Sequence, residues 1–227
     1  MKQRPTTEIL NHDTDSHCIP FDAIQEVRDF LPYASPLRVM WTMLALTGCR
    51  IRELDNMRAS TIYGDVIYWK LGKNQKRHRK ERLPAWFLDE LRIYRETHRV
   101  YQDRLFGVRS DTFRRFFNRD VRPHLTPRWR ELRLVSFMGS LTEEYVYQLN
   151  GLRKSFQTLE FARQLEKWKD PTIALEFTSK KMRHSSAKIT VYHYVENFDA
   201  LRVERSTGLS PAEILGAAHQ RRILDFA

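Results

Sequence analysis

The stretch Thr47-Gly48-Cys49-Arg50-Ile51-Arg52-Glu53-Leu54 joins two segments that both have helical patterns. The apolar run 37–46 before it is long enough for a buried helix, and the apolar residues of 51–57 recur at helical spacing. Gly48 stands where the first helix can end and the next can begin. We therefore expect Arg50 at or near the start of the second helix, with buried residues on both sides.

The charge of Arg50 has two interpretations. A guanidinium is always charged at neutral pH and is costly to bury without a partner. A salt bridge to Glu53 or Asp55 is the simpler interpretation of this stretch taken alone. The alternative is an arginine that is held rigidly so that its two parallel N–H donors can bind a phosphate.

Composition limits the classes of partner. The 227 residues suffice for one domain of ordinary size or two small ones, and 39 Lys and Arg against 28 Asp and Glu give a formal charge of +11. Such an excess of positive charge favours a nucleic acid as the partner and, less strongly, an anionic membrane surface. The sequence has no apolar run as long as a membrane span and no secretory signal. Its two cysteines form neither a disulfide framework nor a zinc cluster, so we expect a reducing compartment: the cytoplasm, near the nucleoid, or a eukaryotic nucleus.

The periodicity predicts a mainly α fold with a small antiparallel β-sheet. Residues 1–19 are polar and aperiodic, which is typical of a flexible tail or linker. Helices are expected at 21–31, 36–46, 86–97, 110–124, 141–165 with a break near Asn150, 171–182 and 210–226, and strands at 61–63, 66–69 and 81–84. The segment 126–139 has no clear pattern.

Two basic surfaces are candidate DNA contacts. The loop 71–80 between the second and third strands carries Lys76, Arg77, Arg79 and Lys80, which could lie on a polyanion or simply form the solvated end of a hairpin. The expected helix 110–124 has a phenylalanine-rich face and an arginine stripe of Arg114, Arg115 and Arg119. Such a stripe can face DNA or only solvent.

Four separated motifs together resemble the catalytic domain of the tyrosine recombinases, the phage-integrase family. They are the Arg50 stretch, Leu71-Gly72-Lys73, Asn150-Gly151-Leu152-Arg153, and the segment from His184-Ser185-Ser186 to Tyr194. The family pattern has an arginine in a Thr-Gly-x-Arg-x-x-Glu-Leu box, a hairpin lysine, a His-x-x-Arg box, and a histidine that precedes the nucleophilic tyrosine by about one helix length. The resemblance extends over residues 21–200 and implies the same fold.

The resemblance implies a role for each motif. Arg50 and Arg153 would bind the scissile phosphate, Lys73 would protonate the departing 5′-oxygen, and His184 would donate a hydrogen bond to the same phosphate. Tyr194 would be the nucleophile, with Tyr192 as the alternative, and would hold the cut strand as a 3′-phosphotyrosine. No metal or other cofactor is expected in this mechanism.

Three features depart from the family pattern. Asn150 replaces the histidine of the His-x-x-Arg box, and an amide cannot accept a proton at neutral pH. His193 is a candidate replacement base. Arg183 replaces the usual glycine before His184, and the spacing from His184 leaves both Tyr192 and Tyr194 open as nucleophile. The alternative hypothesis is therefore a catalytically impaired DNA-binding protein that keeps the fold; a chance match in an unrelated nucleic-acid-binding protein is a third.

The domain prediction is a tail at 1–19, a DNA breaking-rejoining domain at 20–206, and a C-terminal helix at 207–227 that could pack on a neighbouring protomer or on its own domain. Residues before Phe21 are too few for the core-binding domain that family members carry. The resemblance further implies double-stranded DNA as partner, a monomer that assembles into a tetramer on DNA, and a place on a mobile genetic element.

Overall fold

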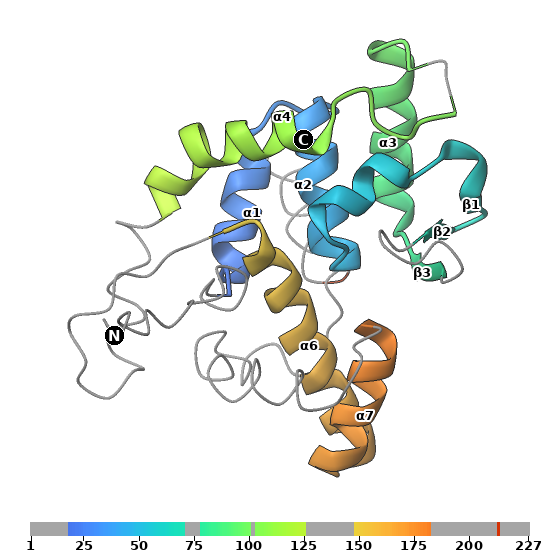
Figure 1. The fold of residues 1–227 in the computed structure, drawn as a ribbon, viewed down its shortest axis with the longest axis vertical. Coiled ribbons are helices and arrows are strands. Elements are labelled where there is room, and N and C mark those ends of the chain that lie inside the picture. The colour runs from blue at the N-terminus through green and yellow to red at the C-terminus, as the bar shows by residue number, and fades with distance from the viewer. Residues whose placement is uncertain (1–17, 71–77, 101–102, 126–147, 183–212, 214–227) are drawn as a thin grey trace, which may run out of the picture.

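The computed structural model describes residues 18–70, 78–100, 103–125, 148–182 and 213. These residues form a mainly helical fold with one small antiparallel sheet, as predicted. Figure 1 shows the sheet at one side of the molecule beside α3 (Ala85–Thr97), with α2 (Pro36–Thr47) in the middle of the helical layer.

Helix α2 is the centre of the core, because every residue from Arg38 to Thr47 is buried. Ser35 caps it by accepting a hydrogen bond from the Arg38 backbone N–H (3.3 Å), and Pro36 occupies the first turn. Helix α1 (Phe21–Phe30) packs beside it, and the Trp41 indole N–H donates to the carbonyl of Ile24 at 2.9 Å. Helices α3 and α6 also contact α2, so α2 connects the elements that surround it.

The sheet has the order β1-β2-β3, with β1 (Ile62–Tyr63), β2 (Val66–Lys70) and β3 (His78–Arg82) all antiparallel. Strand β3 begins at His78, three residues before the predicted start, and Trp69 of β2 is opposite Arg79. A strand so rich in basic residues is possible because its side chains alternate: His78, Lys80 and Arg82 are exposed, while Arg79 is buried.

The segment after Gly48 differs from the expected α-helix. It forms the short 3₁₀-helix η1 (Ile51–Asn56), which is followed by η2 (Ala59–Thr61). The predicted helix 110–124 is present, but it consists of α4 (Ser110–Phe116), a π-helical turn η3 (Phe117–Val121) and helical residues 122–125.

Helices α6 (Asn150–Trp168) and α7 (Pro171–Met182) form a hairpin below α2, drawn in gold and orange in Figure 1. Asp170 caps α7 by accepting from the backbone N–H groups of Thr172 (2.7 Å) and Ile173 (3.0 Å). The expectation that Phe177 is buried is wrong, because its ring is 42% exposed and stacks on the exposed ring of Trp168 with centroids 5.1 Å apart. The small residues Ala174 and Thr178 form the buried face of α7 instead.

The folded region begins before the predicted boundary at Pro20, since Cys18 and Ile19 are fully buried. The preceding residues 1–17, the segment 126–147 and the expected C-terminal helix, except Glu213, lie outside the described residues. None of the helices described here is long and apolar enough to cross a membrane.

Candidate phosphate-binding site

The turn at Gly48 organises the site. Gly48 ends α2 in the left-handed conformation (φ +56°), and its backbone N–H donates to the carbonyl of Leu44 at 2.8 Å. The ring of Phe156 on α6 lies against the glycine so closely that a Cβ at this position would be 2.5 Å from Phe156 Cδ1. Glycine is therefore required here by both the backbone conformation and the packing, and its carbonyl is left available to side chains from other elements.

Arg50 follows this turn with extended backbone and directs its guanidinium to the surface, where the side chain is 62% exposed. Glu53 contacts both the backbone and the side chain of Arg50. One carboxylate oxygen accepts from the Arg50 backbone N–H at 3.1 Å, and the other lies 3.6 Å from the guanidinium. Glu53 is itself buried and accepts from the Trp69 indole at 3.0 Å. The salt bridge to Glu53 is thus present, and it leaves most of the Arg50 guanidinium free to meet a second anion.

Asp55, the other partner considered for Arg50, has a different role. Its carboxylate accepts hydrogen bonds from the backbone N–H of Ser110, at 2.9 Å, and from the Ser110 hydroxyl. It therefore caps the first turn of α4 and contributes no ion pair to Arg50.

Arg153 comes from the first turn of α6 and is 6% exposed. Its two terminal nitrogens donate to the carbonyls of Gly48 (2.7 Å) and Met182 (3.1 Å). Burial, assisted by the nearby charges of Arg79 and Arg50, lowers the pKa of Arg153 to about 9, while the Glu53 carboxylate acts in the opposite direction. The side chain still carries its charge at neutral pH, so the site holds more positive than negative charge.

Arg79 is placed differently from the sequence prediction. It was expected on the surface of the basic loop as a DNA contact, but it is only 3% exposed and faces inward from β3. It donates to the carbonyls of Thr47 and Gly48 (3.2 Å to Gly48) and lies over the rings of Trp69 and Phe156 at 5.4 and 5.3 Å. The strand alternation explains the difference, because residue 79 lies on the same face as the half-buried Glu81.

Asn150 is the first residue of α6 and is half-buried. It precedes Arg153 by three residues, so the two side chains are on the same side of the helix. The other predicted catalytic residues, Lys73, His184, Tyr192 and Tyr194, lie outside the described residues, as do His193, Lys76 and Arg77. The structure therefore brings together Arg50, Arg153 and the helix turn that carries Asn150.

The remaining predicted DNA contacts are on the surface. Lys80, Arg114 and Arg115 are exposed. Arg119 is exposed as well, but two of its three guanidinium nitrogens donate to the Asp120 carboxylate, at 2.7 and 2.6 Å, which offsets part of its charge.

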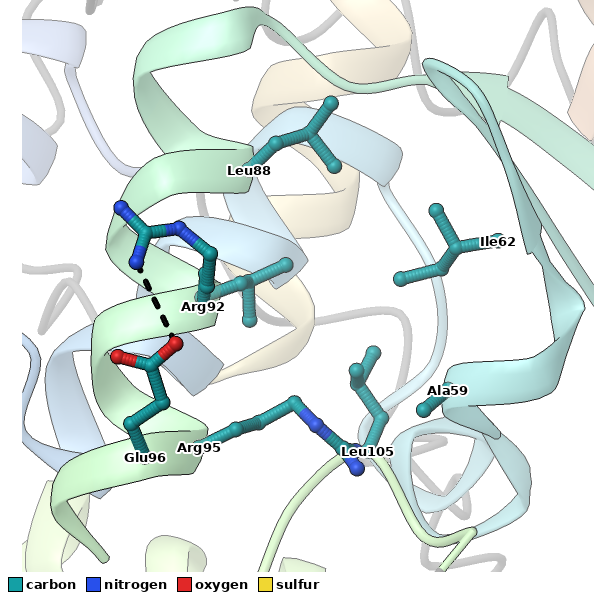
Figure 2. A pocket seen from close by; sticks show the side chains of 8 residues that line it. Ala59, Ile62, Leu88, Arg92, Arg95, Glu96 and Leu105 are labelled. Atoms are coloured by element: carbon teal, nitrogen blue, oxygen red, sulfur yellow. Dashed lines mark hydrogen bonds and ion pairs between the residues drawn. The ribbon is translucent and has the colours of Figure 1, made fainter.

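Metal-ligating groups and pockets are the other possible sites. The described part of the chain contains no group of three or more metal-ligating side chains. A pocket of about 320 Å³ lies between α3 and the η2–β1 segment (Figure 2). It is lined by Ala59, Ile62, Leu88, Leu91, Arg92, Arg95, Glu96 and Leu105, and it includes none of the predicted site residues.

The sequence did not indicate the ion pairs that join α7 to β3 and α6 next to the site. Lys181 on α7 forms ion pairs with Glu81 of β3 (3.3 Å) and Glu160 of α6 (3.0 Å). The inward position of Arg79 was open to prediction from the alternation of β3, had the strand been extended to His78. The pairing of Lys181 with residues from two other elements had no local signal in the sequence.

Comparisons with known proteins support the fold. No protein-family model and no curated protein matches the chain. Among solved structures, XerA recombinase matches with a TM-score of 0.53 and 18% identity over 82% of this chain and 61% of that chain. The XerH site-specific recombinase in a post-cleavage complex with difH substrate (TM-score 0.49, 19% identity, 85% of this chain and 53% of that chain) and a lambda integrase dimer on a COC′ core site (0.46, 18%, 78% and 47%) also match.

The fold assignment rests on the match to XerA recombinase, which has a TM-score above 0.5. The aligned part amounts to 61% of the XerA chain. With the order of the four sequence motifs, this likeness shows that the chain has the fold of a tyrosine recombinase catalytic domain.

Proposed function

We propose that this chain is a site-specific DNA recombinase or integrase that cuts and rejoins DNA through a 3′-phosphotyrosyl intermediate. The observation that supports this most directly is the cluster of Arg50, Arg79 and Arg153 around one turn. Two of these guanidiniums are buried against backbone carbonyls, and the third is exposed next to them. A phosphodiester is a suitable anion for such a site, because arginine stabilises the negative charge that develops on the non-bridging oxygens.

The proposed reaction has two steps. The Tyr194 oxygen attacks phosphorus, the bond between phosphorus and the 5′-oxygen breaks, and Lys73 gives that oxygen a proton. Arg50 and Arg153 hold the phosphate, and His184 donates a hydrogen bond to it. In the second step a 5′-hydroxyl of the partner strand attacks the phosphotyrosine, so that the bond between the strands reforms and the phenol is released.

The proton of the Tyr194 phenol needs an acceptor. Asn150 cannot supply one, since its amide has no basic atom at neutral pH. His193, next to Tyr194 in the sequence, is the proposed base. Double-stranded DNA is the proposed substrate, with a monomer in its absence and a tetramer during strand exchange.

The second candidate function is a DNA-binding protein that has lost strand cleavage. Asn150 favours it, because this residue lies one helical turn before Arg153, at the position where the family pattern has a histidine that can act as a base or acid. This candidate keeps the cationic site and the basic surface but forms no covalent intermediate.

A covalent-adduct assay separates the two candidates. Binding sites are first selected from a library of random duplexes, and the selected duplexes are then prepared with a nick near the cleavage position so that the released fragment diffuses away. We expect the wild-type chain to form an adduct that survives a denaturing gel. Tyr194→Phe should abolish it, whereas Tyr192→Phe should retain it.

The outcomes have distinct meanings. Adduct loss in Tyr192→Phe only would assign the nucleophile to Tyr192. Tight binding without any adduct would support the impaired candidate, and Asn150→His would then be expected to restore cleavage if the missing histidine is the cause. Failure to select any duplex would overturn both candidates.

A further inference from the structure

We propose that Arg79 is a positioning residue that fixes both phosphate-binding arginines through the backbone of the Gly48 turn. This inference rests on the proposed function, and it adds a residue that the four family motifs do not contain. We assign Arg79 an indirect role because its guanidinium is enclosed: its terminal nitrogens donate to Thr47, Gly48 and Glu81, and it lies over the rings of Trp69 and Phe156. Its effect on the reaction must pass through the groups that it holds.

The Gly48 carbonyl is the shared contact. Arg79 donates to it at 3.2 Å from the strand side, and Arg153 donates to it at 2.7 Å from the helix side. The position of this one oxygen therefore affects where the Arg153 guanidinium rests. Because Arg79 also holds the carbonyl of Thr47, two consecutive peptide groups immediately before Cys49 and Arg50 are fixed.

The arrangement also depends on the shape of the arginine fork. One guanidinium binds two neighbouring carbonyls with two nitrogens, while its flat face lies over Trp69 and Phe156. A lysine has one nitrogen on a flexible stem and cannot reproduce both contacts with the same geometry. Arg79→Lys therefore keeps the charge and removes the fork.

Arg79 is itself held in place by neighbours. Its guanidinium is 3.2 Å from Glu81, and Glu81 is paired with Lys181 at 3.3 Å. Another contact joins Arg79 to the sulfur of Met182 at 3.6 Å, and Met182 is the residue whose carbonyl accepts from Arg153. Arg79 thus contacts, directly or through one partner, the turn before Arg50, the helix that bears Arg153 and the end of α7.

A matched control exists elsewhere in the core. Arg38 is also buried, and it also donates to two backbone carbonyls, those of Arg28 (2.7 Å) and Leu31 (3.2 Å), as well as to Glu90. These contacts hold the end of α1 and not the Gly48 turn. Arg38→Lys makes the same chemical change at a comparable depth, away from the proposed site.

Hydrogen–deuterium exchange of the two variants tests the positioning role without using activity. The reporters are the amides of Gly48, Cys49, Arg50 and Glu53, all of which are hydrogen-bonded within the turn. We expect Arg79→Lys to speed exchange in the peptide 47–54 by about tenfold or more relative to wild type, and to leave 21–31 unchanged. Arg38→Lys should do the reverse. Equal exchange of 47–54 in wild type and Arg79→Lys would overturn the inference.

Single-turnover cleavage then tests whether the fixed turn matters for chemistry. With saturating nicked duplex, well below the melting temperature of each variant, we expect Arg79→Lys to form the adduct about 10- to 100-fold more slowly than wild type, with DNA affinity nearly unchanged. Arg38→Lys should react at the wild-type rate. A wild-type rate in Arg79→Lys, despite faster exchange, would refute a role in the reaction. If the wild-type chain forms no adduct, the proposed function fails, and the exchange experiment still decides whether Arg79 holds the turn.

Discussion

Gly48→Ala is the substitution for which the structure gives the clearest magnitude. A non-glycine residue at φ +56° costs about 1 kcal/mol of folding free energy. The new Cβ would also be 2.5, 2.6 and 2.9 Å from the Cδ1, Cγ and Cβ atoms of Phe156, so that α6 must move or the ring must turn. Overpacking of this kind adds about 1–3 kcal/mol, for a total of about 2–4 kcal/mol.

Gly64→Ala is the matched control, because Gly64 has nearly the same backbone angle (φ +60°) and no atom within 4 Å of the new Cβ. It should cost only the backbone contribution of about 1 kcal/mol. At roughly 2–4 °C per kcal/mol for a domain of this size, we expect melting temperatures lower by about 4–16 °C for Gly48→Ala and by about 2–4 °C for Gly64→Ala. Circular dichroism melts and urea titrations measure both. Equal losses in the two variants would show that Phe156 does not press on the turn.

Three other predictions concern the core, the thiol and the surface. Glu90→Gln should lower the free energy of unfolding, measured by urea titration, by about 3–5 kcal/mol, because it leaves the buried Arg28 and Arg38 without their carboxylate. Glu96→Gln, which alters an exposed ion pair, should change this free energy by less than about 1 kcal/mol. Burial raises the pKa of the Cys49 thiol from 9.0 to about 12, so the folded state keeps a proton that the unfolded state loses above pH 9. The difference in unfolding free energy between wild type and Cys49→Ala should therefore be constant below pH 8 and smaller by about 1 kcal/mol at pH 10. A difference that stays constant up to pH 10 would contradict this. Arg114→Ala should reduce the slope of log affinity for duplex DNA against log salt concentration by about 1. Arg119→Ala removes a charge that is already paired with Asp120, so it should reduce this slope less. Equal slopes for wild type and Arg114→Ala would show that α4 is not part of the DNA interface.

Most of the fold could be predicted from local patterns. The proline and serine that start α2, the glycine that ends it, and the Asp170-Pro171 pair that starts α7 are signals with a direct structural cause. The antiparallel sheet followed from β-branched and aromatic residues around Gly64. Basic residues concealed the start of β3, because the charge of 78–80 is typical of a loop unless the alternation of buried and exposed side chains is considered.

The site was only partly predictable, because its geometry depends on contacts between distant segments. The sequence indicated Arg50 and Arg153 by their motifs, but not that both Arg153 and Arg79 donate to the Gly48 carbonyl. The pairing of Arg79 with residues 31 and 32 positions earlier is set by how the sheet packs on α2. The expected burial of Phe177 failed for the same reason, since the approach of α7 to α6 is decided by Ala174 and Thr178.

The most direct test of the central claim compares a charged with a neutral scissile group. If Arg50 and Arg153 act by neutralising the phosphate, Arg153→Ala should slow adduct formation by about 100-fold or more on a normal duplex. The same variant should lose much less, less than about tenfold, on a duplex whose scissile phosphate is replaced by an uncharged methylphosphonate. Arg82→Ala, which removes an exposed arginine paired with Asp65, should react like wild type on both. An equal loss for Arg153→Ala on the charged and the neutral substrate would contradict the account.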